Sequence, residues 1–210
     1  MNAIFLFGGA SIFLTLVLII LSPFFHSRKY ADRTEAFSNI KEVHLALIDF
    51  DTDYGSFPNA STIPAVKAKT STSLALGSSS SNELFRQLIA STAKTESIFW
   101  AKTSATSHRP DGDLTGIHAL EKGECAFTYI AGLSSSSALD APVAMVQVIP
   151  GTWEFDPKPF KGKAVVLRID GSAKIETIDR NGHVMIGGMN IFDPRQPYWR
   201  GKTPDIKWPE

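Results

Sequence analysis

The feature that most constrains this chain is an apolar run near its amino terminus. Ile4 to Phe25 reads IFLFGGASIFLTLVLIILSPFF, 22 residues without a charged side chain. About 20 apolar residues in a helix cross the hydrocarbon core of a bilayer. Residues 1–29 are therefore predicted to form an amino-terminal transmembrane anchor, with the rest of the chain on one side of the membrane.

A cleaved secretory signal peptide is the alternative interpretation of the same run. Such signals carry basic residues before an apolar core of about 7 to 15 residues and end in a cleavage site with small residues. Here no Lys or Arg precedes the run, the core is longer, and LSPFFHSRK offers no such site. An uncleaved anchor is the favoured interpretation.

Length, charge and cysteine content limit what the remaining chain can be. Residues 30–210 suit one compact head rather than two domains. Lys plus Arg and Asp plus Glu both number 21, so the net charge is zero and nucleic acid is not an expected partner. Cys125 is the only cysteine, which excludes an intramolecular disulfide and a metal cluster built from thiolates.

A helix is predicted to run on from the anchor into the head. Between Thr34 and Asp53, apolar residues recur at steps of three and four, as on one face of a helix. They are Phe37, Ile40, Val43, Leu47, Phe50 and Tyr54. Leu45 and Ile48 widen this face, so more than a third of the girth is expected to be buried beneath a sheet. Gly55 and Pro58 end the helix.

The middle of the chain is predicted to be mostly irregular. Residues 60–81 are rich in Ser, Thr, Ala and Gly and are expected to form a surface excursion with little core of its own. Asn82 is predicted to cap a short helix that ends near Lys94 and buries Leu84, Phe85, Leu88 and Ile89. Residues 100–116 are loop by composition.

From Ala126 onward the apolar period changes to two, which predicts an antiparallel meander. A three-residue loop, 169–171, with Gly171 in the left-handed conformation pairs Leu167 with Ala173 and Val165 with Ile175. This register gathers the apolar side chains on one face, whereas a shift of one residue would swap the faces.

Two further predictions concern the end of the chain. At Asn181–Gly182 a tight two-residue turn sets Ile178 opposite Met185 and Thr177 opposite Ile186. The tail, 190–210, has four prolines and two tryptophans and is predicted to be neither strand nor helix. It is expected to pack along the head through Tyr198 and Trp199, although these aromatics could instead form a contact surface for a partner.

No motif for catalysis or for metal binding stands out. The string GLSSSSALD at Gly132 lacks the closing glycine of a nucleophile elbow. The histidines occur singly, without the spacing of a zinc site; they are His26, His44, His108, His118 and His183. The prediction is therefore a protein without catalytic, cofactor-binding or metal-binding residues and without a small-molecule substrate. An anchored enzyme stays open only through the unexplained segment 60–116.

Two acidic clusters resemble calcium loops only superficially. Asp49, Asp51 and Asp53 precede Gly55, but this glycine takes the seventh place of such a loop rather than the sixth, and the twelfth place is Ala60 rather than Glu. A solvated acidic helix end is the better interpretation. The second cluster, Asp111 and Asp113, is a short acidic turn of unspecific spacing.

Several strings together resemble one protein family. Residues 39–58, NIKEVHLALIDFDTDYGSFP, resemble the helix end of pseudopilins and bacterial type IV pilin-like proteins. Residues 164–176, AVVLRIDGSAKIE, are similar to the late strand and Asp-Gly turn of the pilin-like proteins abundant in planctomycetes and verrucomicrobia. Residues 123–137 and 140–147 resemble the middle strands of the same heads.

The resemblance implies an α+β fold, in which a long membrane-spanning helix continues into an amphipathic helix packed on an antiparallel β-sheet. It implies a non-enzymatic structural subunit of a type II secretion or type IV pilus-like assembly. Such a subunit is held in the inner membrane with its head periplasmic or extracellular. Its partners would be the lipid bilayer and other pilin-like subunits, which it contacts through the amino-terminal helix.

The chain departs from the family at its processing site, which keeps a second interpretation open. The family has a basic leader, a glycine and a Glu at the fifth mature position, but here no basic residue precedes Gly8 or Gly9 and the fifth position after Gly9 is Leu14. The alternative is a single-pass anchored binding protein that does not polymerise. The basic residues after the run, Arg28, Lys29 and Arg33, would by the positive-inside rule place the head in the cytoplasm instead.

Overall fold

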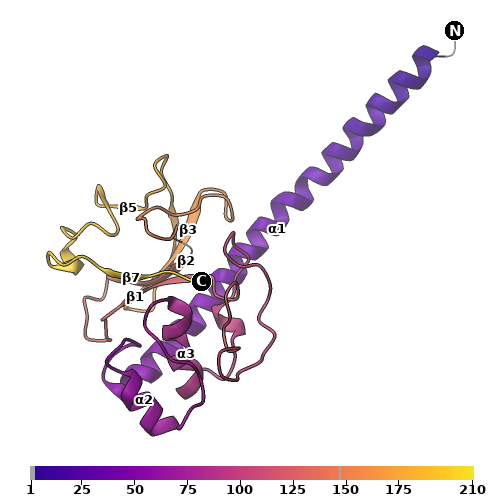
Figure 1. Cartoon of the computed structure of the whole chain (residues 1–210). Helices are drawn as coiled ribbons and strands as arrows, with labels where there is room; N and C mark the ends of the chain where they lie inside the picture. The colour runs from indigo at the N-terminus through magenta and orange to yellow at the C-terminus, as the bar shows by residue number, and fades with distance from the viewer. Residues whose placement is uncertain (1–2, 147) are drawn as a thin grey trace.

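The fold is α+β, with helices packed on an antiparallel sheet, as predicted (Figure 1). The computed structural model describes the backbone of residues 3–146 and 148–210, and side chains from residue 28 onward apart from residue 147. The helices are α1 (Ala3–Tyr54), α2 (Ile63–Thr70) and α3 (Ser81–Ser91), with short 3₁₀ turns at η1 (Ser97–Phe99) and η2 (Pro197–Trp199).

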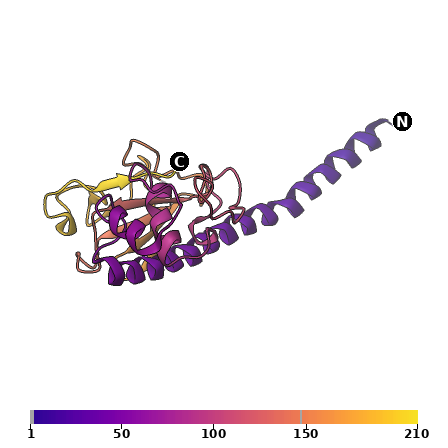
Figure 2. The same cartoon turned by 60° about the horizontal axis from the view of Figure 1, so that its bottom comes forward.

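Helix α1 is the spine of the head and also extends beyond it. Its carboxy-terminal half runs along one side of the strands, and its amino-terminal half projects away from the head (Figure 2). Among the residues whose side chains the structure describes, no helix is both long and apolar enough to cross a membrane. The predicted anchor, residues 1–29, lies outside those side chains except for its last two residues.

The predicted core face of α1 is confirmed, but the burial predicted for Leu45 is wrong. Ile40, Val43, Leu47 and Phe50 are fully buried, whereas Leu45 is 59% exposed. Successive side chains of a helix are rotated by about 100° around its axis. Leu45 is therefore rotated by about 200° from Val43 and from Leu47, and it faces solvent. Ile48, which was predicted to widen the face together with Leu45, is partly buried and packs against the core.

The main sheet has the strand order β4-β3-β2-β1-β7 and is antiparallel throughout. Its strands are β1 (Phe127–Ala131), β2 (Pro142–Val146), β3 (Lys163–Arg168), β4 (Ala173–Thr177) and β7 (Asp205–Lys207). Helix α1 contacts β2, β3 and β4, and α3 contacts β1. Every residue of β1 and β2 is buried, so both faces of the sheet centre are covered.

The hairpin between β3 and β4 has the predicted register. Leu167 pairs with Ala173 and Val165 with Ile175, and Gly171 has φ of +80°. Ile175 is nevertheless 45% exposed, because β4 is an edge strand. The loop is also fixed from α1, since the Nε2–H group of His44 donates a hydrogen bond to the carbonyl of Ile169 at 3.0 Å.

Replacing Gly171 by Ala is expected to lower the free energy of unfolding by about 1–2 kcal/mol, the cost of a left-handed backbone for a residue with a Cβ atom. That Cβ would also lie 2.8 Å from the imidazole ring of His44. Chemical denaturation followed by tryptophan fluorescence measures the change. Gly55→Ala is the matched control, because Gly55 has φ of +78° with no neighbouring atom within 4 Å. An equal loss in both variants would show that His44 adds nothing.

The second predicted turn is wrong by one residue. Ile178 pairs with Val184 rather than with Met185, and the amide of Asp179 donates to the carbonyl of His183. The loop therefore has three residues, 180–182. The Asp179 carboxylate accepts the backbone N–H groups of Asn181 and His183, which favours this wider turn.

The meander does not continue into the main sheet after this turn. Strand β5 (Met185–Ile186) pairs instead with β6 (Met189–Asn190) in a separate two-stranded ribbon. The predicted meander is thus correct only up to β4. Both strands have only two residues and neither is fully buried. Segments this short lack the alternation of apolar and polar residues that indicates a longer strand of the main sheet.

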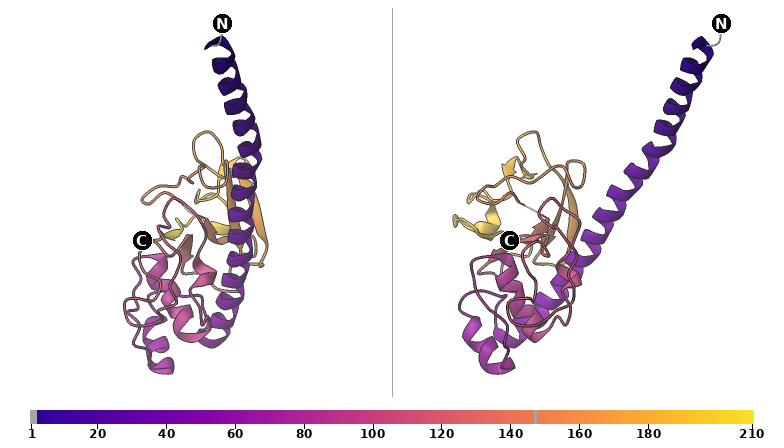
Figure 3. Two further views of the ribbon diagram at one scale, coloured as in Figure 1. Left: turned by 90° about the vertical axis from the view of Figure 1, so that its right-hand side faces the viewer. Right: turned by 45° about the vertical axis from the view of Figure 1, so that its right-hand side comes forward.

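The segment 60–81 contributes to the core, contrary to prediction. It contains α2, with Pro64 in its first turn and Val66 fully buried, and Leu74 beyond the helix is also buried. The Thr62 hydroxyl donates to the Gln87 side chain at 2.6 Å, which ties this segment to α3. Figure 3 shows α2 and α3 beside the carboxy-terminal end of α1.

Helix α3 exists as predicted, but Asn82 is not its cap. The Ser80 side chain accepts the backbone N–H of Glu83 and caps the helix, which ends at Ser91 rather than near Lys94. Asn82 is buried and donates to the carbonyls of Leu120 and Glu121. Its role is to hold a distant loop.

The tail is anchored as predicted but is not wholly irregular. Tyr198 and Trp199 are buried and both donate to the carbonyl of Ile191. Residues 205–207 form β7, which pairs with β1 at the edge of the sheet. Proline is tolerated beside an edge strand, and the prolines flank β7 without interrupting it, so a proline-rich tail can still supply a short strand.

Candidate functional site

The acidic residues considered as calcium ligands do not converge. Asp51 accepts a hydrogen bond from the Ser135 hydroxyl, while Asp53 forms an ion pair with Lys69 at 2.8 Å. Asp111 and Asp113 accept backbone N–H groups within their own turn. In the part of the chain that the structure describes, no group of three His, Cys, Asp or Glu side chains is placed to hold a metal ion.

Three of the histidines and the cysteine serve local structure, whereas the side chain of His26 lies outside the described residues. His44 contacts a loop carbonyl, His108 lies 3.4 Å from Glu124, and His118 lies 2.5 Å from Glu121. Cys125 is buried, and burial raises the pKa of its thiol to about 12. A thiol that stays protonated at neutral pH is a core residue and not a nucleophile.

The long connection between α3 and β1 is held from inside by two buried charged side chains. Arg86 donates to the carbonyls of Ala75 and Ala119. The Glu96 carboxylate accepts the backbone N–H groups of Gly112 and Leu120, and burial raises the pKa of Glu96. Because the hydrogen bonds of both groups go to the backbone, the geometry gives them a role in fixing the loop.

The most distinctive surface lies where α1 leaves the head. Two adjoining cavities there are each lined by four basic residues, of which Lys29 is shared. We call these seven residues the basic collar: Arg28, Lys29, Arg33, Lys102, Lys158, Lys161 and Lys163. Among the described side chains, Asp32 is the only carboxylate that lines either cavity.

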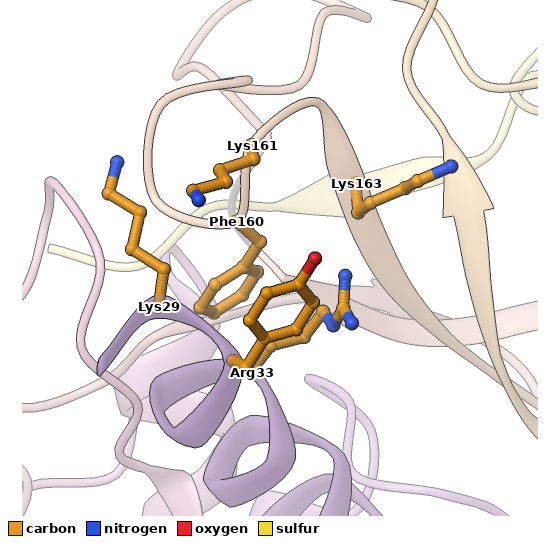
Figure 4. A pocket seen from close by; sticks show the side chains of 6 residues that line it. Lys29, Arg33, Phe160, Lys161 and Lys163 are labelled. Carbon is orange, nitrogen blue, oxygen red and sulfur yellow. The ribbon is translucent and has the colours of Figure 1, made fainter. Parts of the chain in front are cut away.

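Contacts between α1 and the segment before β3 assemble the collar. The Lys29 ammonium group donates to the carbonyl of Lys158 at 2.7 Å, across 129 positions of sequence. Phe160 is buried beneath this contact and fixes the loop against the helix. Figure 4 shows Lys29 and Arg33 rising from α1 beside the loop that carries Phe160 and Lys161.

An exposed tyrosine lies at the centre of the collar. The Tyr30 side chain is 54% exposed, with the Arg33 guanidinium 5.0 Å and the Lys161 ammonium 5.6 Å from its ring centre. Both distances suit a cation–π contact. Lys163 is held at the rim by donating to the Thr177 hydroxyl at 2.7 Å.

The chemistry of the collar is that of a shallow anion-binding surface. No ion pair joins any of its seven residues to a carboxylate among the residues that the structure describes. The cavity beside Tyr30 holds about 80 Å³, far below the 300 Å³ at which small-molecule sites usually begin. That cavity would admit one small anionic group, whereas the adjoining cavity beside Lys102 and Lys158 holds about 430 Å³.

Comparison with protein-family models, curated proteins and solved structures finds no match to this chain.

The sequence alone pointed to three of the seven collar residues. Arg28, Lys29 and Arg33 were noted as charges that flank the apolar run. Lys158, Lys161 and Lys163 carry no comparable signal, because they join the collar only through the packing of their loop against α1.

Proposed function

We propose that this chain is a membrane-anchored, non-enzymatic, pilin-like structural subunit of a type II secretion or type IV pilus-like assembly. The observation that carries the proposal is that one helix includes the apolar run and also packs beneath the sheet of the head. Helix α1 begins at Ala3, in the apolar run, and continues to Tyr54 beneath the sheet. A subunit of this kind needs one continuous helix that serves both as anchor and as spine of the head.

The distribution of burial along α1 supports this reading. The first fully buried residue among the described side chains is Ala36, and burial then follows the stripe to Phe50. The projecting part carries the uncharged run Ile4–Phe25, which can be covered by lipid or by neighbouring apolar helices. In this proposal the run lies in the inner membrane, and the head lies on its periplasmic or extracellular side.

A single-pass anchored binding protein that does not polymerise is the second candidate. The observation that favours it is Leu14, which stands where the family carries a Glu. Without that carboxylate, a neighbour's amino terminus has no charged partner, so assembly through the helices would depend on apolar packing alone.

Disulfide cross-linking within native membranes tests the proposal. Single cysteines at Leu14, Leu18 and Leu21 lie on one face of the helix, and the natural Cys125 does not compete because it is buried. A polymerising subunit is expected to cross-link through this face to a second copy or to another subunit with an apolar amino-terminal helix, identified by mass spectrometry. A cysteine at Leu45, exposed on the head helix, is the control.

The outcomes separate the two candidates. Absence of cross-links from all three positions, with the chain present in the membrane, contradicts polymerisation and supports the anchored binding protein. Protease accessibility of the head in intact and opened cells tests its side of the membrane. Amino-terminal sequencing tests processing, since an intact Met1 excludes maturation by a leader peptidase.

A further inference from the structure

We propose that the basic collar binds the phosphate groups of anionic phospholipids and so seats the head against the membrane surface. This inference rests on the proposed function, because it requires the apolar run to lie in the bilayer. It adds a lipid class as a partner, and it assigns the contact to named residues of both α1 and the loop before β3.

The position of Arg28 along α1 matches the level of the lipid headgroups, and Arg33 lies a few ångströms beyond that layer. A helix rises about 1.5 Å per residue, so Arg28 and Arg33 lie about 5 and 12 Å beyond Phe25, the last residue of the apolar run. The headgroup layers lie immediately outside a hydrocarbon core about 30 Å thick. Lys161 and Lys163 are brought to the same level because their loop packs against α1.

The concentration of charge at this end is specific to the collar. The chain as a whole is neutral, with 21 basic and 21 acidic residues, yet one third of the basic residues gather here. A basic residue near an anionic membrane surface strengthens binding by about fivefold. Lys29 and Lys163 bond to a carbonyl and a hydroxyl, so their charges stay available to a phosphate.

Tyr30 completes the resemblance to an interfacial site. Tyrosine is enriched at the boundary between lipid and water, where its ring lies among the headgroups. In this chain the exposed ring is flanked by Arg33 and Lys161. A headgroup phosphate beside Tyr30 would contact both cations, and the small cavity there has room for a group of that size.

Native mass spectrometry of the full chain in mild detergent tests the inference. The protein is offered equal amounts of phosphatidylglycerol and phosphatidylcholine with the same acyl chains. We expect it to retain the anionic lipid about tenfold more strongly, and rising salt should weaken that preference. The variant Lys29→Gln, Arg33→Gln, Lys161→Gln, Lys163→Gln is expected to lose it.

A matched variant controls for the total loss of charge. Lys67→Gln, Lys122→Gln, Lys174→Gln and Arg180→Gln remove the same number of exposed charges elsewhere on the head and should leave the preference intact. Unfolding midpoints establish that both variants remain folded. A third arm adds inorganic phosphate, which should displace the lipid only weakly.

The outcomes separate a lipid site from a site for free phosphate and from no anion site. Equal retention of both lipids by the native chain, or equal retention by both variants, overturns the lipid site. Complete displacement by inorganic phosphate overturns it in favour of a site for free phosphate. If the chain is nevertheless recovered in the membrane fraction, the proposed function still stands. If the chain is found in the soluble fraction, both the lipid site and the proposed function are contradicted.

Discussion

Replacing Leu47 by Ala is expected to lower the free energy of unfolding by about 3 kcal/mol, within the range for a buried leucine. Leu47 is fully buried in the stripe by which α1 packs into the core. The substitution removes apolar contacts and leaves a cavity that the sheet cannot fully close, since the strands are held by hydrogen bonds on both sides. Denaturant unfolding of the full chain in mild detergent, followed by tryptophan fluorescence, measures the loss.

Leu45→Ala is the control for this experiment. The same residue type stands two positions earlier on the same helix but is 59% exposed, so its replacement should change stability by about 0.5 kcal/mol or less. Similar losses in both variants would contradict the packing of α1 described here, because they would mean that the helix does not present Leu47 to the core.

Placing Arg at both Leu14 and Val17 is expected to move the chain out of the membrane fraction. Each Arg at the centre of a spanning helix costs about 2.5–3.5 kcal/mol, and the two together would shift the insertion equilibrium by roughly 10⁴-fold. Alkaline carbonate extraction followed by immunoblotting measures the distribution. The native chain should resist extraction, and the variant should appear in the soluble fraction or be degraded.

The control for this variant places Arg at Leu45 and Ile117 instead. These residues are 59% and 66% exposed on the head, so the chain gains the same charge without altering the apolar run. It should stay in the membrane. Extraction of the native chain itself by carbonate would contradict the anchor and, with it, the proposed function.

Local patterns predicted the parts of the fold that depend on neighbouring residues. The buried stripe of α1 follows from helical periodicity, and the register at Gly171 follows from alternation together with the need for a left-handed glycine. Both signals lie within one element or one turn. The same reasoning was wrong at Asn181–Gly182, because the Asp179 side chain stabilises a wider loop than the dipeptide alone suggests.

Features that depend on distant packing could not be predicted. Val66 lies in a segment of low-complexity composition, and its burial depends on α3. Residues 205–207 form a strand only because β1 offers them an open edge. The basic collar combines both kinds of feature. Lys29 and Arg33 stand next to the apolar run in the sequence, whereas Lys161 joins them only through a tertiary contact.

The pairing of β7 with β1 has a consequence for biogenesis. Strand β1 obtains its outer neighbour from residues 205–207, so a chain still emerging from the ribosome carries an unpaired sheet edge until these residues are made. Unpaired strand edges recruit other chains, so the nascent head is vulnerable to association with other chains until this strand has been made. Chaperones that shield strand edges would be most needed in the interval before Asp205 emerges.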